Sequence, residues 1–428
     1  MFISKASDNR STTQETSAST RILVIGAGYA GLLFTMRLAG KVAKQHVQIA
    51  LVSEFDTFTE RPRMHQFATN QAVQWRSLPQ MLRRTNVQFI QGRVTSINPA
   101  QHEIVITHQQ QTQHVGYDYL VYALGSETDR KTVPGVAEYA YTLAPRGPLS
   151  AAALRDALPS IEARGGQVVV AGGGATGIET AAEVASAYPH IKVHLVTREP
   201  VALFLNKSVG SSIRRRLVRL GVETIDQVTV TAVRAQSVVT DQGAELACDL
   251  CIWTGGFVAP PLAKEAGLAV NERNQIVVDP FLRSISHPEI YAIGDAADPR
   301  EDPGAHVRMS AVTAAIMGAY GADSLSAVLH GKAPRPFSFA YLGQGIALGR
   351  HSAIGFNNYP DDRPIPPYFT GWLGYQIREA FVRYLAAAPR FERRWPGLFV
   401  WPGKRRYEAA QRREPAQAEN NSMRLHRV

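Results

Sequence analysis

The pattern of apolar and polar positions contains the same three-part unit twice. Residues 21–25 form a β-branched apolar run that predicts a buried strand, and a glycine-rich turn and a helical pattern over residues 32–42 follow it. A second apolar run over residues 47–52 predicts the next strand. The order of strand, glycine turn, helix and strand predicts a βαβ unit with parallel strands.

The unit returns 146 residues later, counted from Gly26 to Gly172. Apolar runs over residues 167–171 and 192–196 flank a second glycine turn and a helical pattern over residues 178–187. Further short strands are predicted at residues 104–107, 119–123, 228–233, 250–253 and 276–278. The chain therefore carries two similar nucleotide-binding units.

Both turns have the G-x-G-x-x-G spacing of a dinucleotide site. Their glycines are Gly26, Gly28 and Gly31 in the first unit and Gly172, Gly174 and Gly177 in the second. In such a site the first glycine permits the tight turn, the second lets the backbone approach a pyrophosphate, and the third lets helix pack on strand. Glycine clusters also form ordinary turns, so the prediction depends on the strand before and the helix after.

The two units differ at the position that would bind a ribose. Glu54 stands 23 residues after Gly31, where a carboxylate accepts from a ribose hydroxyl, although a solvated carboxylate at a strand end is the alternative. The second unit has Thr197 and Arg198 there. A guanidinium pairs with a 2′-phosphate, so this unit is predicted to accept NADPH as well as NADH. Alternatively, Arg198 points into solvent and Glu199 binds the ribose.

Composition narrows the class of protein. A length of 428 residues predicts two or three domains. Two cysteines are too few for a disulfide scaffold or an all-cysteine cluster, and no metal site is expected. Residues 1–20 are polar, without the apolar stretch of a secretory signal, and the longest uncharged apolar run, residues 309–322, is shorter than a membrane span. A cytoplasmic protein is expected.

Five motifs follow one another in a specific order, at residues 26–31, 122–125, 172–179, 253–256 and 290–295. Together they resemble the two-dinucleotide-binding-domain flavoproteins, and most of all the type II NADH dehydrogenase family, over roughly residues 20–355. The resemblance implies an α/β fold with two Rossmann-like domains. Its expected parts are a disordered tail at 1–20, an FAD-binding domain at 21–150 and 275–333, an inserted NAD(P)H-binding domain at 151–274, and a C-terminal section at 334–428.

The resemblance also assigns roles to individual residues. FAD would bind the first unit and NAD(P)H the second. Gly125, Gly256 and Gly294 would line the cofactor sites, and Asp295 would reach the ribityl chain. Glu179, at the start of the second helix, would lie near the nicotinamide and is the candidate catalytic residue.

Two further residues have equally good alternatives. Val94 resembles the family's backbone contact to adenine, and packing in a core strand explains it as well. Arg63 lies in residues 58–65, a candidate lining of the flavin pocket that could equally be a charged surface loop.

Two features depart from the resembled families. The helix that faces flavin and quinone usually carries glutamines, and residues 308–318 contain none, which weakens the case for a quinone. Cys248 and Cys251 form a C-x-x-C pair, but they follow the second glycine motif by 71 residues on an apolar strand. Buried structural thiols are therefore expected, with a disulfide reductase as the fallback.

The C-terminal section is basic and amphipathic. The chain has a net charge of +10, and six of these charges lie in residues 389–428. Apolar residues recur at helical spacing over residues 371–388, and Trp395, Phe399, Trp401 and Tyr407 then alternate with basic residues. This pattern suits an anionic membrane surface, and a helix packed on the flavin domain with a solvated tail is the alternative.

The sequence thus predicts an FAD-dependent NAD(P)H dehydrogenase that passes electrons to a quinone or another acceptor. Alternatives are a reductase for a ferredoxin- or rubredoxin-like carrier and a flavin-binding sensor. Peripheral contact with the cytoplasmic membrane face and a homodimer are left open. Nucleic acid is not an expected partner, because no reading motif accompanies the basic tail.

Overall fold

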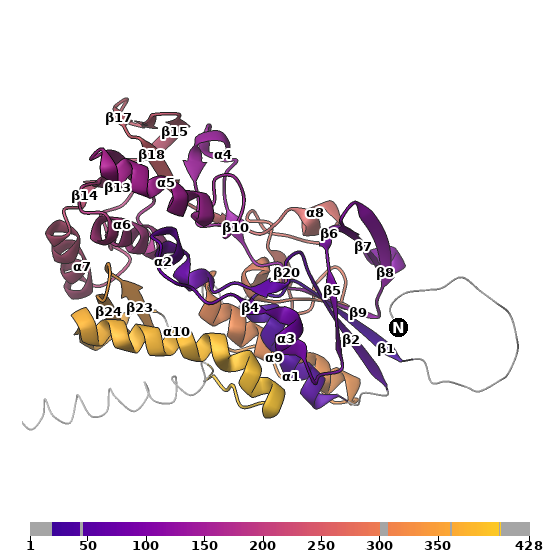
Figure 1. Cartoon of the computed structure of the whole chain (residues 1–428). Coiled ribbons are helices and arrows are strands. Elements are labelled where there is room, and N and C mark those ends of the chain that lie inside the picture. The colour runs from indigo at the N-terminus through magenta and orange to yellow at the C-terminus, as the bar shows by residue number, and fades with distance from the viewer. Residues whose placement is uncertain (1–18, 43–45, 300–306, 360–361, 402, 404–428) are drawn as a thin grey trace, which may run out of the picture.

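The computed structural model describes residues 19–42, 46–299, 307–359, 362–401 and 403, and it confirms the predicted α/β fold (Figure 1). The first sheet is parallel, and its strands lie in the order β21 (Ile290–Ala292), β9 (Tyr119–Tyr122), β1 (Thr20–Ile25), β2 (Val47–Ser53), β5 (Val87–Gln91). Strand β21 enters this sheet from far along the chain. The sheet is therefore built from two segments that a second unit separates.

The second sheet is also parallel and five-stranded. Its order is β11 (Ala140–Tyr141), β18 (Leu250–Trp253), β12 (Gln167–Ala171), β13 (Lys192–Thr197), β14 (Glu223–Asp226). The helices of this unit are α5 (Ala151–Ala163), α6 (Ala175–Ala187) and α7 (Lys207–Arg219). The arrangement repeats the crossover pattern of the first sheet, as the sequence predicts.

The helices that follow the two glycine motifs both begin earlier than the sequence pattern indicates. Helix α1 (Tyr29–Lys41) starts directly after Gly28, and α6 starts directly after Gly174. The predicted starts were residues 32 and 178. The difference arises because the last residues of each glycine motif already form the first helical turn.

Smaller elements surround the two sheets. They are β3 (Thr57–Phe58), β4 (Arg76–Ser77), β6 (Arg93–Asn98), β7 (Glu103–His108), β8 (Gln111–Gly116), β10 (Glu127–Thr128), β15 (Val230–Arg234), β16 (Ser237–Thr240), β17 (Glu245–Ala247), β19 (Phe257–Val258), β20 (Ile276–Val278), β22 (Ala297–Pro299), α2 (Met64–Ala68), α3 (Leu78–Leu82), α4 (Val136–Tyr139) and α8 (Leu262–Glu265). Short 3₁₀ turns lie at Arg61–Arg63, Pro99–Gln101 and Gly294–Ala296.

Helix α9 (Ala311–Leu329) packs tightly across α1. A Cβ at Gly318 would lie 2.4 Å from the Ala30 carbonyl oxygen, so the two backbones meet where only glycine fits. Within the described residues, α9 is also the one helix long and apolar enough to cross a membrane, and 67% of its apolar window is buried. Because it contacts the first sheet's helix and carries an ion-paired Asp323, we interpret it as a core helix.

The C-terminal section consists of a small antiparallel sheet and a long helix. Strands β23 (Gly343–Ala347), β24 (Ala353–Asn358) and β25 (Pro364–Thr370) precede α10 (Gly371–Arg394), which is longer than the predicted 371–388. Helix α10 runs along the underside of the molecule, from the small sheet to α1 (Figure 1). Tyr407 and most of the basic tail lie outside the described residues.

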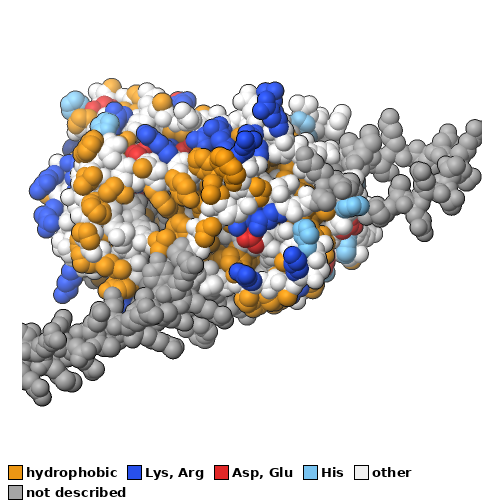
Figure 2. Space-filling view, turned by 90° about the horizontal axis from the view of Figure 1, so that it is seen from below, with side chains coloured by type: hydrophobic (Ala, Val, Ile, Leu, Met, Phe, Trp, Pro, Cys, Tyr) orange, Lys and Arg blue, Asp and Glu red, His pale blue; other side chains and the backbone are white. Residues whose placement is uncertain are grey.

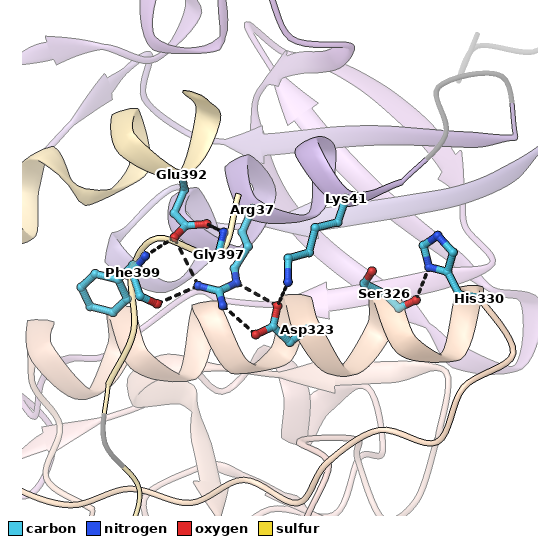
Figure 3. A network of polar contacts seen from close by, with 8 residues as sticks. All are labelled: Arg37, Lys41, Asp323, Ser326, His330, Glu392, Gly397 and Phe399. Carbon is cyan, nitrogen blue, oxygen red and sulfur yellow. Dashed lines mark hydrogen bonds and ion pairs between the residues drawn. The ribbon is translucent and has the colours of Figure 1, made fainter. Parts of the chain in front are cut away.

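A buried polar network fixes the far end of α10 to the first unit (Figure 3). Arg37 of α1 donates to Asp323 of α9 at 2.7 Å, to Glu392 of α10 at 3.2 Å, and to the carbonyl of Phe399 at 2.8 Å. Glu392 is fully buried and also accepts from the Gly397 amide at 2.7 Å. One guanidinium therefore joins α1, α9, α10 and the segment after α10.

Candidate functional site

The first glycine turn has the shape that a pyrophosphate requires. Gly26 has φ +99°, and a Cβ there would lie 2.3 Å from the Ala123 carbonyl oxygen. A Cβ at Gly31 would lie 1.9 Å from the carbonyl oxygen of Gly26. Gly28, in contrast, faces open space, since a Cβ there would meet nothing within 4 Å. The middle glycine thus opens a space at the N-terminus of α1, where phosphate binding is favoured.

The second turn repeats this geometry. A Cβ at Gly172, which has φ +126°, would lie 2.5 Å from Thr254 Oγ1, and one at Gly177 would lie 1.8 Å from the Gly172 carbonyl oxygen. Gly174 again faces open space at the start of a helix. The shared pattern of two packed glycines around an open one fits two nucleotide cradles and is not what a pair of ordinary turns requires.

Asp295 fits the ribityl-binding role. It follows Gly294, which has φ +72°, and its Oδ2 accepts from Ser126 Oγ at 2.7 Å. Its Oδ1 is buried and has no hydrogen-bond partner among the described residues. Burial raises the pKa of Asp295, against the hydrogen bond from Ser126, the charge of Arg61 and the backbone amide of Ser310. A buried acceptor without a donor costs stability, and a ribityl hydroxyl would supply that donor.

Arg61 and Arg63 both lie near this cradle, in different settings. Arg61 is exposed, donates to the Ser126 carbonyl at 2.5 Å, and lies 4.0 Å from where a Cβ of Gly125 would be. Arg63 is turned into the protein, where it pairs with Glu60 at 2.9 Å and Glu379 at 2.6 Å. The flavin-pocket role of Arg63 stays a prediction, and Arg61 is a second arginine of the same segment that lies near Gly125.

Glu54 and Val94 stay compatible with both of their interpretations. Glu54 follows the last residue of β2, at the carboxyl edge of the sheet, and is 48% exposed with Arg93 at 3.8 Å. A weak exposed pair leaves this carboxylate available to a ribose. Val94 lies on β6, is half-buried, and packs against the core of the first unit.

In the second unit the last residue of β13 is buried, and the two residues after it are exposed. Thr197 is buried, its hydroxyl donates to the carbonyl of Glu199, and a Cβ at Gly173 would lie 2.6 Å from Thr197 Cβ. Thr197 therefore packs under the glycine turn. Arg198 and Glu199 are both exposed, so both interpretations of this position stay predictions.

Glu179 lies on the first turns of α6 and faces the C-terminal section. Its Oε1 accepts from the amide of Ala347 at 2.9 Å and from Arg378 Nη2 at 3.0 Å. Arg378 belongs to α10, almost 200 residues further along the chain. No sequence pattern linked the two residues. Gly256, with φ +72°, lies beyond β18, close to the turn that begins at Gly172.

The two cysteines are free and buried, Cys251 on β18 and Cys248 just before it. Burial raises the pKa of Cys248 to about 11 and raises the pKa of Cys251 further. A thiolate nucleophile is therefore disfavoured, which argues against a disulfide reductase.

Comparison with known proteins agrees with this geometry. The profile of the pyridine nucleotide-disulphide oxidoreductase family matches residues 20–319. The chain is 27% identical to the demethylphylloquinone reductase NdbB of Synechocystis sp., over 79% of this chain and 87% of that protein. It is 25% identical to the type II NADH:quinone oxidoreductase of Haemophilus influenzae, over 78% and 86%. The structure of NDH2 from Plasmodium falciparum with NADH superposes with a TM-score of 0.73, at 17% identity, over 89% of this chain and 99% of that one.

Proposed function

Because this chain belongs to the pyridine nucleotide-disulphide oxidoreductase family, we propose that it is an FAD-dependent NAD(P)H dehydrogenase that delivers electrons to a quinone. The family implies FAD binding and NAD(P)H use. The observation that carries the proposal for this chain is the pair of matched cradles, each with an open middle glycine at a helix N-terminus.

The residues of the chain act by binding and orientation. The amides at Gly28 and Gly174 would hold the two pyrophosphates, Asp295 the ribityl chain, and Glu54 the adenosine ribose. Bound FAD would supply the ring that accepts a hydride from the nicotinamide and passes on electrons. Aligning two rings in one site replaces a bimolecular encounter with a positioned step, so this transfer needs no side-chain acid or base.

Quinone is the acceptor that the relatives' names favour, since two of them act on quinones by name at 25–27% identity. The missing glutamines on α9 weigh against it. A reductase for a small electron-carrier protein is the second candidate, because the exposed basic residues would attract an acidic partner.

We also propose that the protein attaches peripherally to a membrane through α10. The outer face of this helix and the residues after it expose large apolar side chains, namely Trp372, Leu373, Ile377, Phe381, Tyr384, Phe391, Trp395, Leu398 and Val400. Figure 2 views this underside and shows orange hydrophobic patches among blue Lys and Arg side chains. Apolar and cationic groups together suit an anionic bilayer surface, where a quinone would dissolve.

The test separates the two half reactions. Purified yellow protein mixed anaerobically with NADH or NADPH should bleach within one turnover time. Reoxidation of the reduced flavin is then followed after adding a short-chain quinone, ferricyanide, oxygen or an oxidised electron-carrier protein. Each acceptor is tested with and without lipid. Colourless protein that takes up no FAD would refute the proposal. Fast bleaching without quinone reduction would refute only the quinone as the acceptor and leave the NAD(P)H dehydrogenase in place.

A further inference from the structure

A cavity beside the start of α9 has two residues in its lining whose polar atoms lack partners. The lining includes Gly294, Asp295, Arg308 and Thr313. Oδ1 of Asp295 and Nε of Arg308 are both buried, and neither has a hydrogen-bond partner among the described residues. One of these atoms is an acceptor and the other is a donor. Each costs stability unless a ligand supplies the missing partner, so the cavity is suited to a ligand that carries both a hydroxyl and a carbonyl.

Contacts within the protein fix both the backbone and the side chain of Arg308. Its amide donates to Tyr341 Oη at 2.8 Å, and its carbonyl accepts from Thr313 Oγ1 at 2.7 Å. Its Nη1 donates to Gln344 Oε1 at 2.8 Å, and its Nη2 donates to Asp362 Oδ1 at 2.7 Å. The guanidinium also lies over the Tyr341 ring, with Cζ 4.7 Å from the ring centroid. Because the guanidinium is planar, these contacts hold the Nε–H in one orientation.

The cavity joins Arg308 to the residue that is proposed to bind the ribityl chain. Burial raises the pKa of Asp295, and the backbone amide of Ser310, two residues after Arg308, is one of the groups that lower it. Asp295 is therefore in contact with the segment that carries Arg308. In FAD the ribityl chain is bonded to N10 of the ring, next to the edge formed by N1 and the C2 carbonyl. A flavin whose ribityl hydroxyl binds Asp295 brings this edge close to the Arg308 segment.

The N1–C2 edge is where the flavin ring gains charge. Hydride transfer carries two electrons and one proton from the nicotinamide to flavin N5, so NAD(P)H becomes NAD(P)⁺ and the reduced ring holds one negative charge on N1 and the C2 carbonyl. This step is balanced without a further oxidant or proton. A negative charge in a buried site is costly unless a cation or a positive dipole lies beside it. Helix α9 begins at Ala311 beside the cavity with its positive end, and Arg308 adds a full positive charge.

We propose that Arg308 stabilises the reduced flavin: its Nε–H donates to the N1–C2 edge, and its charge offsets the negative charge that the ring gains. The inference rests on the proposed function, because it assigns the first cradle to FAD. The pair with Asp362 lowers the net charge at this place but leaves the Nε donor available. The C-terminal section takes part in the flavin chemistry, since Gln344 of β23 and Asp362 hold the guanidinium.

The midpoint potential of the FAD-loaded protein tests this without relying on turnover. Arg308→Met should weaken the binding of reduced FAD relative to oxidised FAD about tenfold, the size of one charge-assisted hydrogen bond. For a two-electron couple this lowers the midpoint potential by about 30 mV. Arg308→Lys should recover part of the loss. Sulfite gives an optical readout, because it adds to flavin N5 and leaves a negative charge on the same edge, and Arg308→Met should weaken its binding about tenfold.

Arg283→Met is the matched control. Arg283 pairs with Asp279 at 2.7 Å and is 33% exposed, and Arg308 pairs with Asp362 at 2.7 Å and is 31% exposed. Each guanidinium also lies over an aromatic ring, but Arg283 is not among the described residues that line the cavity. Arg283→Met should leave the potential and the sulfite affinity unchanged. Equal shifts in both variants, or an unchanged potential in FAD-loaded Arg308→Met, would overturn the proposal in favour of a purely structural contact.

Asp362→Asn keeps the test decisive if Arg308→Met does not retain FAD. It removes the anionic partner of the guanidinium, so the midpoint potential should rise, whereas a purely structural contact predicts no rise. An unchanged or lower potential in Asp362→Asn would then overturn the proposal. If the unmodified protein takes up no FAD, the proposed function itself fails, which is a different result from FAD-loaded protein whose potential does not depend on Arg308.

Discussion

At the scale of single residues, Arg198 is predicted to set the preference between the two nicotinamide nucleotides. It is exposed beside β13, where no carboxylate precedes it to repel a 2′-phosphate. Arg198→Ala should raise the KM for NADPH about tenfold and leave the KM for NADH within twofold. Glu199→Ala is the neighbouring control. An unchanged ratio of the two KM values after Arg198→Ala would mean that the Arg198 side chain points into solvent and does not bind the 2′-phosphate.

Glu183 is predicted to make stability fall as pH rises. Burial raises the pKa of this carboxyl on α6, despite hydrogen bonds from Gln71 and Thr69 and the nearby charge of Arg350. A carboxyl with a raised folded pKa binds more protons when folded, so its contribution is present below about pH 4.5, the unfolded value, and is lost as pH rises through the folded pKa.

The matching measurement is the Tm of Glu183→Gln relative to the unmodified protein. The variant should gain Tm over the unmodified protein as the pH rises above about 4.5, because its amide never ionises. The exposed Glu199→Gln supplies the baseline. A constant difference across pH would show that Glu183 does not titrate in this range.

The local geometry of single residues was predictable only where a short motif fixes the backbone. The glycines of both cradles and Asp295 could be located, because each requires a particular backbone shape within a few residues. The contacts of Arg61 with Ser126 and of Arg378 with Glu179 could not be predicted, because the fold brings together residues that lie far apart in the sequence.

At the scale of elements, the Arg37 network is predicted to be a main attachment of α10. Arg37 is 6% exposed, and its removal would leave fully buried Glu392 without its cation. Arg37→Met should cost about 3 kcal/mol of unfolding free energy, the usual effect of breaking one side of a buried pair.

Lys41→Met provides the matched comparison, because Lys41 contacts the same Asp323 but is 29% exposed. Its cost should be under about 1 kcal/mol. Urea denaturation of both variants measures the difference. Equal costs would place the stabilisation in Asp323 itself and not in the link between α1 and α10.

The elements themselves were largely predictable, and the exceptions have physical causes. Buried β-branched runs identified β1, β2, β12 and β13, because parallel strands covered on both faces are apolar throughout. The small sheet β23 to β25 was not predicted, since its strands contain glycine and proline and pack mainly on α10.

At the scale of the whole molecule, the exposed face of α10 is predicted to bind anionic lipid. Vesicles with phosphatidylglycerol should co-sediment the protein, and phosphatidylcholine vesicles should do so weakly. Replacing Trp372 and Phe381 by serine should weaken binding roughly tenfold, because two exposed aromatic side chains then no longer enter the interface.

Ile285→Ser is the control for this experiment, since Ile285 is 57% exposed but lies outside α10. It should leave lipid binding unchanged. Equal binding to both kinds of vesicle, or an unchanged affinity after the double replacement, would favour a protein partner for this face.

The first sheet is built from two separate segments of the chain, and this determines when it can fold during synthesis. Strand β9 needs β21 as its neighbour, and α1 needs α9, so the flavin cradle lacks two walls until residues past 329 have left the ribosome. The sheet of the inserted unit, in contrast, is complete by β18, although its core also takes in Ile346 and Ile354 of the C-terminal sheet. We therefore expect the middle sheet to form first and flavin to be taken up late, after α9 has been made.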